Sequence, residues 1–183
     1  GYNYLYRLNC GGDDYTDSFG QLWLQDNTNY SRSWAENFKD LNPYLASQRT
    51  TNDPIHGTRD WTLFQHFRFG RHQLEYRFPV ADGTYRIELY FTEPWHGTGG
   101  SASADCEGLR IFDVAVNDSV VLDDLDIWAE SGHDGVCKKV VYAIVKGGML
   151  KIHFPEVKAG QALISGIAIA STDQELKPTA FPA

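Results

Sequence analysis

The sequence predicts an all-β fold, an antiparallel β-sandwich of the jelly-roll type. Apolar and polar residues alternate in many short segments, turns rich in Gly and Asp separate these segments, and aromatic residues make up 14% of the chain. Period-two alternation is typical of strands with one face on a core, and aromatic side chains fit a pleated, half-buried surface. Short strands joined by turns favour a sandwich. At 183 residues the chain is long enough for one domain with one sizeable core.

Three turns each join two alternating segments, and each predicts a hairpin. "LEYRFPV" and "YRIELYF" flank the first turn, "LRIFDVAVN" and "SVVLDDL" the second, and "VVYAIVK" and "MLKIHF" the third. Gly and Asp tolerate the positive φ values that tight turns demand. A last apolar segment, "ALISGIAIAS", is expected to be an inner strand. The turn residues are Asp82–Gly83, Asn117–Asp118 and Gly147–Gly148.

Two long segments interrupt this strand pattern. Residues 25–60 are polar and contain proline, and residues 97–108 are rich in Gly, Ser and Ala. Loops of this length in a compact domain are usually functional or disordered. No helix longer than a turn or two is expected, because Pro43 stops the short helical pattern "WAENFKDLNPYL". We assign residues 1–172 to the sandwich and residues 173–183 to a linker or tail toward the rest of a larger protein.

The charge and the cysteines limit the kinds of partner and cofactor. A net charge of -8 without a basic run argues against nucleic acid as a partner. The sequence lacks an apolar run of the roughly 20 residues that span a bilayer, so membrane insertion is not expected, although export stays open. Cys106 and Cys137 flank the same pair of expected strands, which leaves a disulfide between them open, and Cys10 is expected to be a buried thiol.

The common catalytic motifs do not occur in the sequence. G-x-S-x-G, G-x-G-x-x-G, H-E-x-x-H and the Walker loop are missing from the sequence. A glycosidase site with two carboxylates stays open, because any two of the 24 acidic residues could lie within the roughly 5 to 10 Å that it needs. No cofactor is expected, except that two acidic clusters could hold a structural calcium ion or, alternatively, act as turn acids. These clusters are Asp13, Asp14 and Asp17, and Asp123, Asp124 and Asp126.

Aromatic residues in the irregular segments indicate a carbohydrate-binding site. Sugars present apolar C–H faces ringed by hydroxyls, so proteins stack rings on the faces and direct polar side chains at the hydroxyls. The alternative is that each ring closes the end of the sandwich. The predicted site consists of the rings of Trp34, Phe69, Trp95 and His96, beside Arg71, Glu93, Lys158 and Gln161.

Three stretches resemble malectin-like domains, which form carbohydrate-binding module family 57. "RLNCGGDDYTDSFGQLWLQD" is similar to their opening strand and loop, and "LFQHFRFGRHQLEYRFPVADGTYRIELYFTEPWHG" to their central block. "RIFDVAVNDSVVLDDLDIWAESG" resembles their most specific stretch, a K/R-x-F-D-V-x-V-N motif followed by L-D-I. The resemblance extends from Tyr6 to Ser171.

The resemblance implies a β-sandwich that binds carbohydrate without cleaving it. This sequence is most similar to copies attached to bacterial glycoside hydrolases, notably of family 2. It therefore implies an exported module, in the periplasm or at the cell surface, whose partners are a polysaccharide or oligosaccharide and the catalytic domain of the same polypeptide. The alternative is a structural sandwich that braces this catalytic domain or a dimer partner and has no ligand of its own.

By position, the resemblance also implies roles for the site residues. Trp34 falls in the loop of the family's first sugar-facing tyrosine, Phe69 replaces the second, and Trp95 with His96 replaces an adjacent aromatic pair. The loop of the family's binding acid lies near Lys158 to Gln161, where no Asp stands. These replacements imply a ligand other than the glucose disaccharide that malectin binds.

Overall fold

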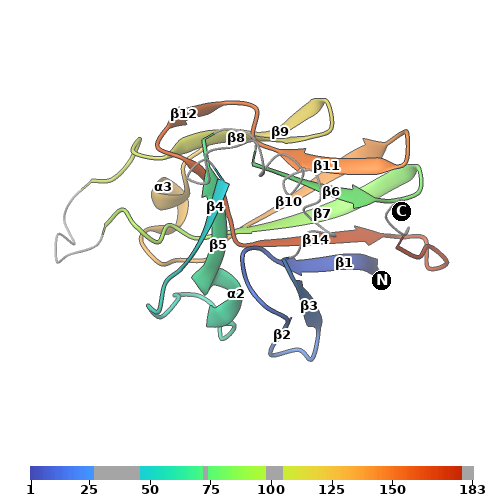
Figure 1. The fold of residues 1–183 in the computed structure, drawn as a ribbon, viewed down its shortest axis with the longest axis horizontal. Coiled ribbons are helices and arrows are strands. Elements are labelled where there is room, and N and C mark those ends of the chain that lie inside the picture. The colour runs from blue at the N-terminus through green and yellow to red at the C-terminus, as the bar shows by residue number, and fades with distance from the viewer. Residues whose placement is uncertain (27–45, 72–73, 98–104, 179–183) are drawn as a thin grey trace.

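The computed structural model of the protein describes residues 1–26, 46–71, 74–97 and 105–178, and they form three β-sheets (Figure 1). A six-stranded sheet and a five-stranded sheet lie face to face, and a smaller sheet crosses one end of them. The six-stranded sheet has the order β10 (Cys137–Val145), β7 (Gly83–Phe91), β14 (Gly166–Ser171), β1 (Asn3–Asn9), β3 (Leu22–Gln25) and β2 (Tyr15–Thr16). The five-stranded sheet has the order β12 (Val157–Ala159), β8 (Ile111–Val116), β11 (Met149–His153) and β6 (Glu75–Pro79), with β9 (Ser119–Leu125) paired to β8. The third sheet has the order β13 (Ala162–Ile164), β5 (His66–Gly70) and β4 (Ala46–Thr50).

The two large sheets enclose one main core, as the predicted sandwich requires. Phe91 of β7 and Phe112 of β8 lie in opposite sheets, and their ring centroids are 6.0 Å apart. Tyr6 of β1 meets Phe78 of β6 at 5.0 Å. Apart from the parallel pair β1 and β3, the described strands pair antiparallel. The predicted fold class, an all-β antiparallel sandwich, is confirmed.

Two of the three predicted hairpins are wrong. The strands β8 and β9 form the hairpin expected around Asn117. In contrast, β6 pairs with β11 and β7 pairs with β10, so the turns after β6 and after β10 each carry the chain from one sheet to the other. The two crossings lie side by side, since Gly148 N–H donates to Asp82 Oδ1 at 2.8 Å. Either arrangement buries the alternating apolar residues, and for this reason alternation alone does not distinguish them.

The irregular segments contain more regular structure than the sequence suggested. Strand β4 lies inside the expected loop of residues 25–60, and the last apolar segment is divided between β13 and β14, which belong to different sheets. In the described ranges there are two helices of five residues each, α2 (Trp61–Gln65) and α3 (Ile127–Ser131). The short helical pattern expected at residues 34–45 lies outside the described residues. No helix in the described part of the chain is long and apolar enough to cross a membrane.

The first and last described strands hold the two ends of the sandwich together. Strand β1 pairs with β14, and the side-chain amide of Asn3 donates to the backbone oxygens of Asp173 and Leu176 at 3.0 and 2.9 Å. Leu176 also packs against the core. Residues 173–176 therefore lie on the sandwich, and the linker role expected of residues 173–183 stays a prediction.

All three cysteines are buried thiols, and Cys106 and Cys137 do not form the disulfide that the sequence left open. Cys137 Sγ donates to Glu130 Oε2 at 3.4 Å. Burial raises the pKa of the Cys137 thiol to about 11. The expectation that Cys10 is buried is confirmed.

A buried carboxylate, Glu88 of β7, connects this strand to β10 and to β1 in the six-stranded sheet. It accepts hydrogen bonds from the hydroxyls of Tyr4 and Tyr90, and it pairs with Lys138 at 2.9 Å and Arg86 at 3.3 Å. Burial acts to raise the pKa of Glu88, but the hydrogen bonds from Tyr4, Lys138 and Tyr90 outweigh burial and lower it to about 2. Glu88 is therefore ionised in the folded protein at neutral pH.

Candidate functional site

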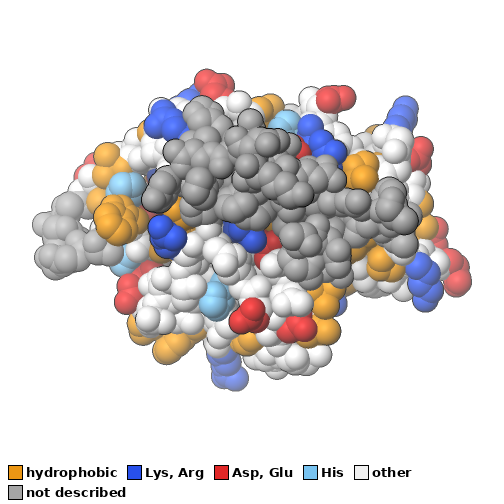
Figure 2. Space-filling model, in the orientation of Figure 1, with side chains coloured by type: hydrophobic (Ala, Val, Ile, Leu, Met, Phe, Trp, Pro, Cys, Tyr) orange, Lys and Arg blue, Asp and Glu red, His pale blue; other side chains and the backbone are white. Residues whose placement is uncertain are grey.

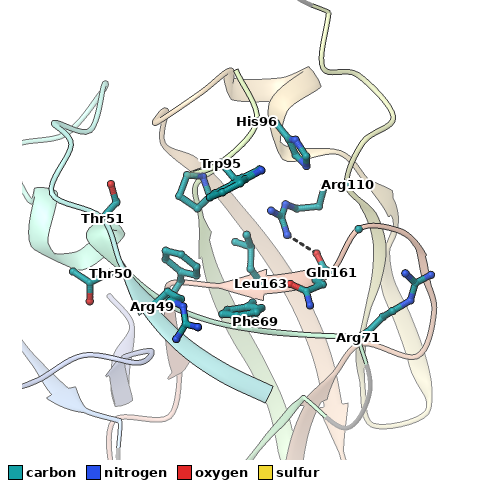
Figure 3. Close-up of a pocket in the computed structure, with 13 residues that line it drawn as sticks. Arg49, Thr50, Thr51, Phe69, Arg71, Trp95, His96, Arg110, Gln161 and Leu163 are labelled. Atoms are coloured by element: carbon teal, nitrogen blue, oxygen red, sulfur yellow. Dashed lines mark hydrogen bonds between the residues drawn. The ribbon is translucent and has the colours of Figure 1, made fainter. Parts of the chain in front are cut away.

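A cavity of about 690 Å³, called the pocket below, lies where the third sheet crosses the end of the sandwich. Ligand-binding cavities typically measure roughly 300 to 1,000 Å³. Four separate parts of the chain line it: β4 with the residues after it, β5, the segment after β7 with the residue before β8, and the turn from β12 into β13. In the order of the chain, the lining residues are Arg49, Thr50, Thr51, Phe67, Phe69, Arg71, Pro94, Trp95, His96, Arg110, Gly160, Gln161 and Leu163 (Figure 3).

Strand β5 supplies the aromatic floor of the pocket. Successive side chains of a strand point to opposite faces, so Phe67 and Phe69 face the pocket while Arg68 points the other way. Arg68 forms a buried ion pair with Asp26. Leu163 of β13 is fully buried and pairs with Phe69 across the sheet. The predicted ring of Phe69 therefore lies on a rigid, apolar base.

Trp95 lies above this floor, although 73% of its surface is exposed to solvent (Figure 3). Its loop begins directly after β7, and a buried carboxylate holds it: Glu93 Oε2 accepts the backbone N–H groups of Trp95 and His96 at 3.1 and 3.3 Å. The backbone oxygen of Glu93 accepts the N–H of Asp134 at 2.9 Å. The tryptophan is thus presented to solvent by an anchored segment.

The structure changes the role expected of Glu93. Its side chain is fully buried, so it does not face the pocket as a partner for sugar hydroxyls. Instead, Glu93 Oε1 pairs with Arg110 Nε at 2.6 Å and Oε2 with Arg110 Nη2 at 3.3 Å. The backbone carbonyl of Gln161 accepts Arg110 Nη1 at 2.7 Å, the bond that is drawn in Figure 3. Glu93 is a supporting residue that orients Arg110, Trp95 and His96.

Two lining arginines, Arg49 and Arg110, were not predicted from the sequence. Arg49 lies in β4, inside the expected loop, and its guanidinium carbon is 5.7 Å from the ring centroid of Phe69. Arg110 occupies the first position of the K/R-x-F-D-V-x-V-N motif, which was read only as a sign of the family. With the predicted Arg71, the pocket has three arginines. In Figure 2, Lys or Arg, His and hydrophobic side chains adjoin around β4 and α3.

Gly97 allows the loop of Trp95 to pass close to its support. Its φ is +91°, a backbone conformation that residues with a side chain rarely adopt. An added Cβ would also lie 3.0 Å from both His133 Cβ and Trp128 Nε1. The backbone conformation and the close approach together require glycine here. The residue after His96 therefore contributes to the position of the two predicted side chains.

Lys158 does not line the pocket, contrary to the sequence-based expectation. Its ammonium group is hydrogen bonded to Asp124 and lies 3.8 Å from Asp123. Lys158 belongs to β12, which pairs with β8, and the hairpin partner β9 carries these two acids. Opposite charges on β12 and β9, two strands that both pair with β8, therefore draw Lys158 away from the site.

The structure brings together five of the eight predicted site residues. Trp34 lies outside the described residues, Glu93 is buried behind Arg110, and Lys158 points to β9. The five that line the pocket are Phe69, Arg71, Trp95, His96 and Gln161. That any of them contacts a sugar stays a prediction.

Three of the six acids considered for calcium accept backbone hydrogen bonds. Asp14 accepts one backbone N–H at 2.7 Å, Asp17 accepts two at 2.9 Å, and Asp126 accepts two at 2.7 and 3.1 Å. These contacts fit the alternative of turn acids. A structural calcium ion stays a prediction.

Two groups of side chains in the described ranges have the spacing of metal ligands, and the first of them includes Asp123 and Asp124 of the predicted acidic cluster. Within each group, one ligand atom per residue lies within 4.8 Å of the others. In the first group, Asp124 already binds the ammonium of Lys158. In the second, His133 Nε2 lies 2.9 Å from Asp134 Oδ2, and burial raises the pKa of Asp134 to about 6. The groups are Asp113, Asp123 and Asp124, and Asp53, His133 and Asp134.

Two solved structures share the fold. Bacteroides uniformis β-glucuronidase 2, covalently bound to cyclophellitol-6-carboxylate aziridine, superposes with a TM-score of 0.70 at 23% identity, over 90% of this chain and 17% of that one. The ANXUR1 extracellular domain from Arabidopsis thaliana superposes with a TM-score of 0.71 at 17% identity, over 100% of this chain and 52% of that one.

Sequence comparisons show the family. Malectin of Danio rerio is 25% identical over 150 residues, which are 81% of this chain and 47% of that protein. Malectin of Mus musculus is 26% identical over 149 residues, or 81% of this chain and 45% of that protein. The chain thus spans about half the length of these curated relatives. A family model described as the malectin domain matches residues 4–174, so this chain belongs to the malectin domain family, whose fold binds carbohydrate.

Proposed function

We propose that this chain is a non-catalytic carbohydrate-binding module of a larger bacterial glycoside hydrolase. The observation that carries the proposal is the tryptophan above the aromatic floor: Trp95 is 73% exposed and lines the pocket together with Phe69. Leaving a large apolar ring in water is unfavourable, and stacking a sugar face on it removes that surface from solvent.

Polar side chains around the rings supply the hydrogen bonds that fix a sugar. His96, Gln161 and Thr51 can each donate and accept, and Arg71 donates. The affinity expected for such a shallow contact is micromolar to millimolar, which corresponds to about -8 to -4 kcal/mol. Trp34, which belongs to the predicted site, is expected to add a further ring.

The lining residues also support a role in binding rather than in hydrolysis. A glycosidase of the common type needs two carboxyl groups on either side of the scissile bond. Among the described residues that line the pocket, none is Asp or Glu, and the nearby Glu93 is fully buried against Arg110. We therefore assign any hydrolysis to another domain of the parent protein.

Similarity to a bacterial enzyme supports the choice of parent. β-Glucuronidase 2 of Bacteroides uniformis contains a region with this fold that makes up 17% of its chain. We infer that the parent is similar to enzymes of glycoside hydrolase family 2, acts on polysaccharide, and is exported to the periplasm or the cell surface. The module would keep the catalytic domain of the same polypeptide close to its substrate.

Isothermal titration of the chain against a panel of oligosaccharides and polysaccharides tests the proposal. Trp95→Ala is expected to weaken binding at least tenfold, whereas Trp61→Ala should bind within twofold of the unchanged protein. Trp61 is a matched control because it is 45% exposed but lies on α2, outside the pocket. Absence of heat with every saccharide, or unchanged binding by Trp95→Ala, would overturn the proposal.

One observation favours a second role, that of a sandwich bracing the catalytic domain. Strand β10 is at the edge of the six-stranded sheet, and three outward apolar side chains on it are exposed: Val140, Tyr142 and Ile144. Exposed apolar rows of this kind mark contact surfaces between domains. If bracing were the only role, no saccharide would protect Trp95 from quenching of its fluorescence.

A further inference from the structure

The charge of the pocket is opposite to that of the chain. The chain has a net charge of -8, yet three arginines line the pocket. Glu93 neutralises Arg110 through their buried pair. In the described part of the chain, no carboxylate forms an ion pair with Arg49 or Arg71. Two positive charges without a carboxylate partner among the described residues therefore line the pocket.

These two charges lie on either side of the aromatic floor. Figure 3 shows Arg49 and Arg71 flanking Phe69, with Trp95 above. The guanidinium of Arg49 is 5.7 Å from the centre of the Phe69 ring, and one of its nitrogens donates to the backbone oxygen of Gln48 at 3.2 Å. A guanidinium has five N–H donors, so most donors of Arg49 remain for a ligand.

The hydrogen-bonding groups that line the pocket favour a ligand that accepts hydrogen bonds. Arginine only donates, and the described lining residues include no carboxylate that could accept from sugar hydroxyls. A carboxylate on the ligand accepts several hydrogen bonds at once, and arginine binds it through two parallel N–H···O bonds. Such bonds are roughly twice as strong as those between neutral groups.

We propose that the pocket selects saccharides that carry a ring carboxylate, that is, uronic acids. The sugar ring stacks between Trp95 and Phe69, and the carboxylate accepts hydrogen bonds from Arg71 or Arg49 at the edge of the floor. This inference rests on the proposed function, since it names the class of sugar for the same pocket.

The test compares pairs of ligands that differ only in the charged group. An oligosaccharide of glucuronic acid, its carboxyl-reduced form and a sulfated neutral oligosaccharide of equal length are titrated into the protein at 0.1 M salt. The uronic acid is expected to bind at least tenfold more tightly than the other two. Increasing the salt from 0.1 to 1 M should weaken only the binding of the charged ligands, because the screening length falls from about 10 to about 3 Å.

Arginine variants connect this preference to the pocket. Arg49→Gln and Arg71→Gln are each expected to lower the affinity for the uronic acid several-fold, and to lower it much more than the affinity for the reduced form. Arg77→Gln is the matched control, because Arg77 is an exposed arginine on β6, outside the pocket. Thermal unfolding of each variant verifies that the fold is intact.

The outcomes separate this inference from the proposed function. Equal affinity for the acid and its reduced form, with loss of both in Trp95→Ala, would overturn the acid preference and leave carbohydrate binding in place. Tighter binding of the sulfated ligand would overturn the assignment of the charge to a carboxylate. Failure of every saccharide to bind would overturn both proposals.

Discussion

Replacing Glu93 by glutamine is expected to destabilise the sandwich and, at the same time, to lower the affinity of the pocket for saccharide. The carboxylate of Glu93 holds Arg110 by two contacts and the N–H groups of Trp95 and His96 by two more. Glutamine preserves the size of the side chain but replaces one acceptor oxygen by a donor. The NH₂ group would then face either the guanidinium of Arg110 or the backbone N–H groups, donor against donor.

The magnitude follows from the burial of the pair. Arg110 is 8% exposed, and removing one partner of a buried ion pair costs about 3 to 5 kcal/mol. The remaining amide oxygen still accepts hydrogen bonds on one side of the group, and Arg110 retains its bond to the Gln161 carbonyl. We therefore expect a loss of about 2 to 3 kcal/mol in the free energy of unfolding. In a domain of this size, such a loss lowers the melting temperature by roughly 5 to 10 °C.

Two measurements on one pair of variants test this reasoning. Chemical denaturation gives the free energy of unfolding, and titration with the best saccharide gives the dissociation constant. Glu107→Gln is the matched control, because Glu107 is an exposed residue of the same type in the chain between Trp95 and Arg110. The control should lie within about 0.5 kcal/mol of the unchanged protein, as surface substitutions usually do. Glu93→Gln should bind about tenfold more weakly, because the segment of Trp95 and His96 loses a charged acceptor.

Two results would refute this role of Glu93. If Glu93→Gln unfolded like Glu107→Gln, the pair with Arg110 would not be buried as the structure has it. If stability were unchanged but binding were lost, Glu93 would contact the sugar directly, as the sequence had predicted.

Two further predictions concern Glu88 and Lys158. The pKa of Glu88 is lowered to about 2, so its stabilisation is complete above the unfolded value of about 4.5 and is lost as the pH falls through the folded pKa. Between pH 4.5 and 2 the free energy of unfolding of the unchanged protein should therefore fall by about 2 to 3 kcal/mol more than that of Glu88→Gln. Parallel curves of unfolding free energy against pH for the two proteins would contradict this. Lys158→Ala should leave the saccharide dissociation constant within twofold, because the lysine faces Asp124. A tenfold loss of affinity in titration would show instead that Lys158 belongs to the binding site.

Alternation in the sequence predicted where strands lie, but not how they connect. Residues of β6 and β7 alternate as expected, and Phe78 and Ile87 are both buried. A hairpin would place these residues on one face of a single sheet, whereas a crossing places them on two faces that meet. Both arrangements remove the same side chains from water, so the hydrophobic pattern is identical. Pairing is decided by long-range contacts such as that of Gly148 with Asp82, which local patterns do not encode.

The sequence predicted those pocket residues that can be recognised from their immediate neighbours in the chain. Trp95 and His96 stand out because a large ring follows directly on a strand, and Phe69 was found as an aromatic residue at the end of an expected strand. Arg49 was missed because its strand, β4, has the mostly polar sequence "ASQRT", which shows no alternation of apolar and polar residues. Glu93 and Lys158 were misplaced for a related reason, because their partners Arg110 and Asp124 lie 17 and 34 residues away in the chain.

The net charge of the chain does not describe the charge of the pocket, because the fold separates the charges. The acids of the chain are used elsewhere: Asp17 and Asp126 accept backbone N–H groups, and Glu88 joins strands of the six-stranded sheet. Two arginines without a carboxylate partner among the described residues are left beside an aromatic floor. At low salt, where the screening length reaches about 30 Å, an approaching anion meets the field of the whole negative chain. Near 0.1 M salt that length is about 10 Å, and the ligand meets mainly the field of the pocket. Affinity for a uronic acid should therefore be greatest at intermediate salt, a dependence that neither a uniformly negative surface nor an uncharged pocket would produce.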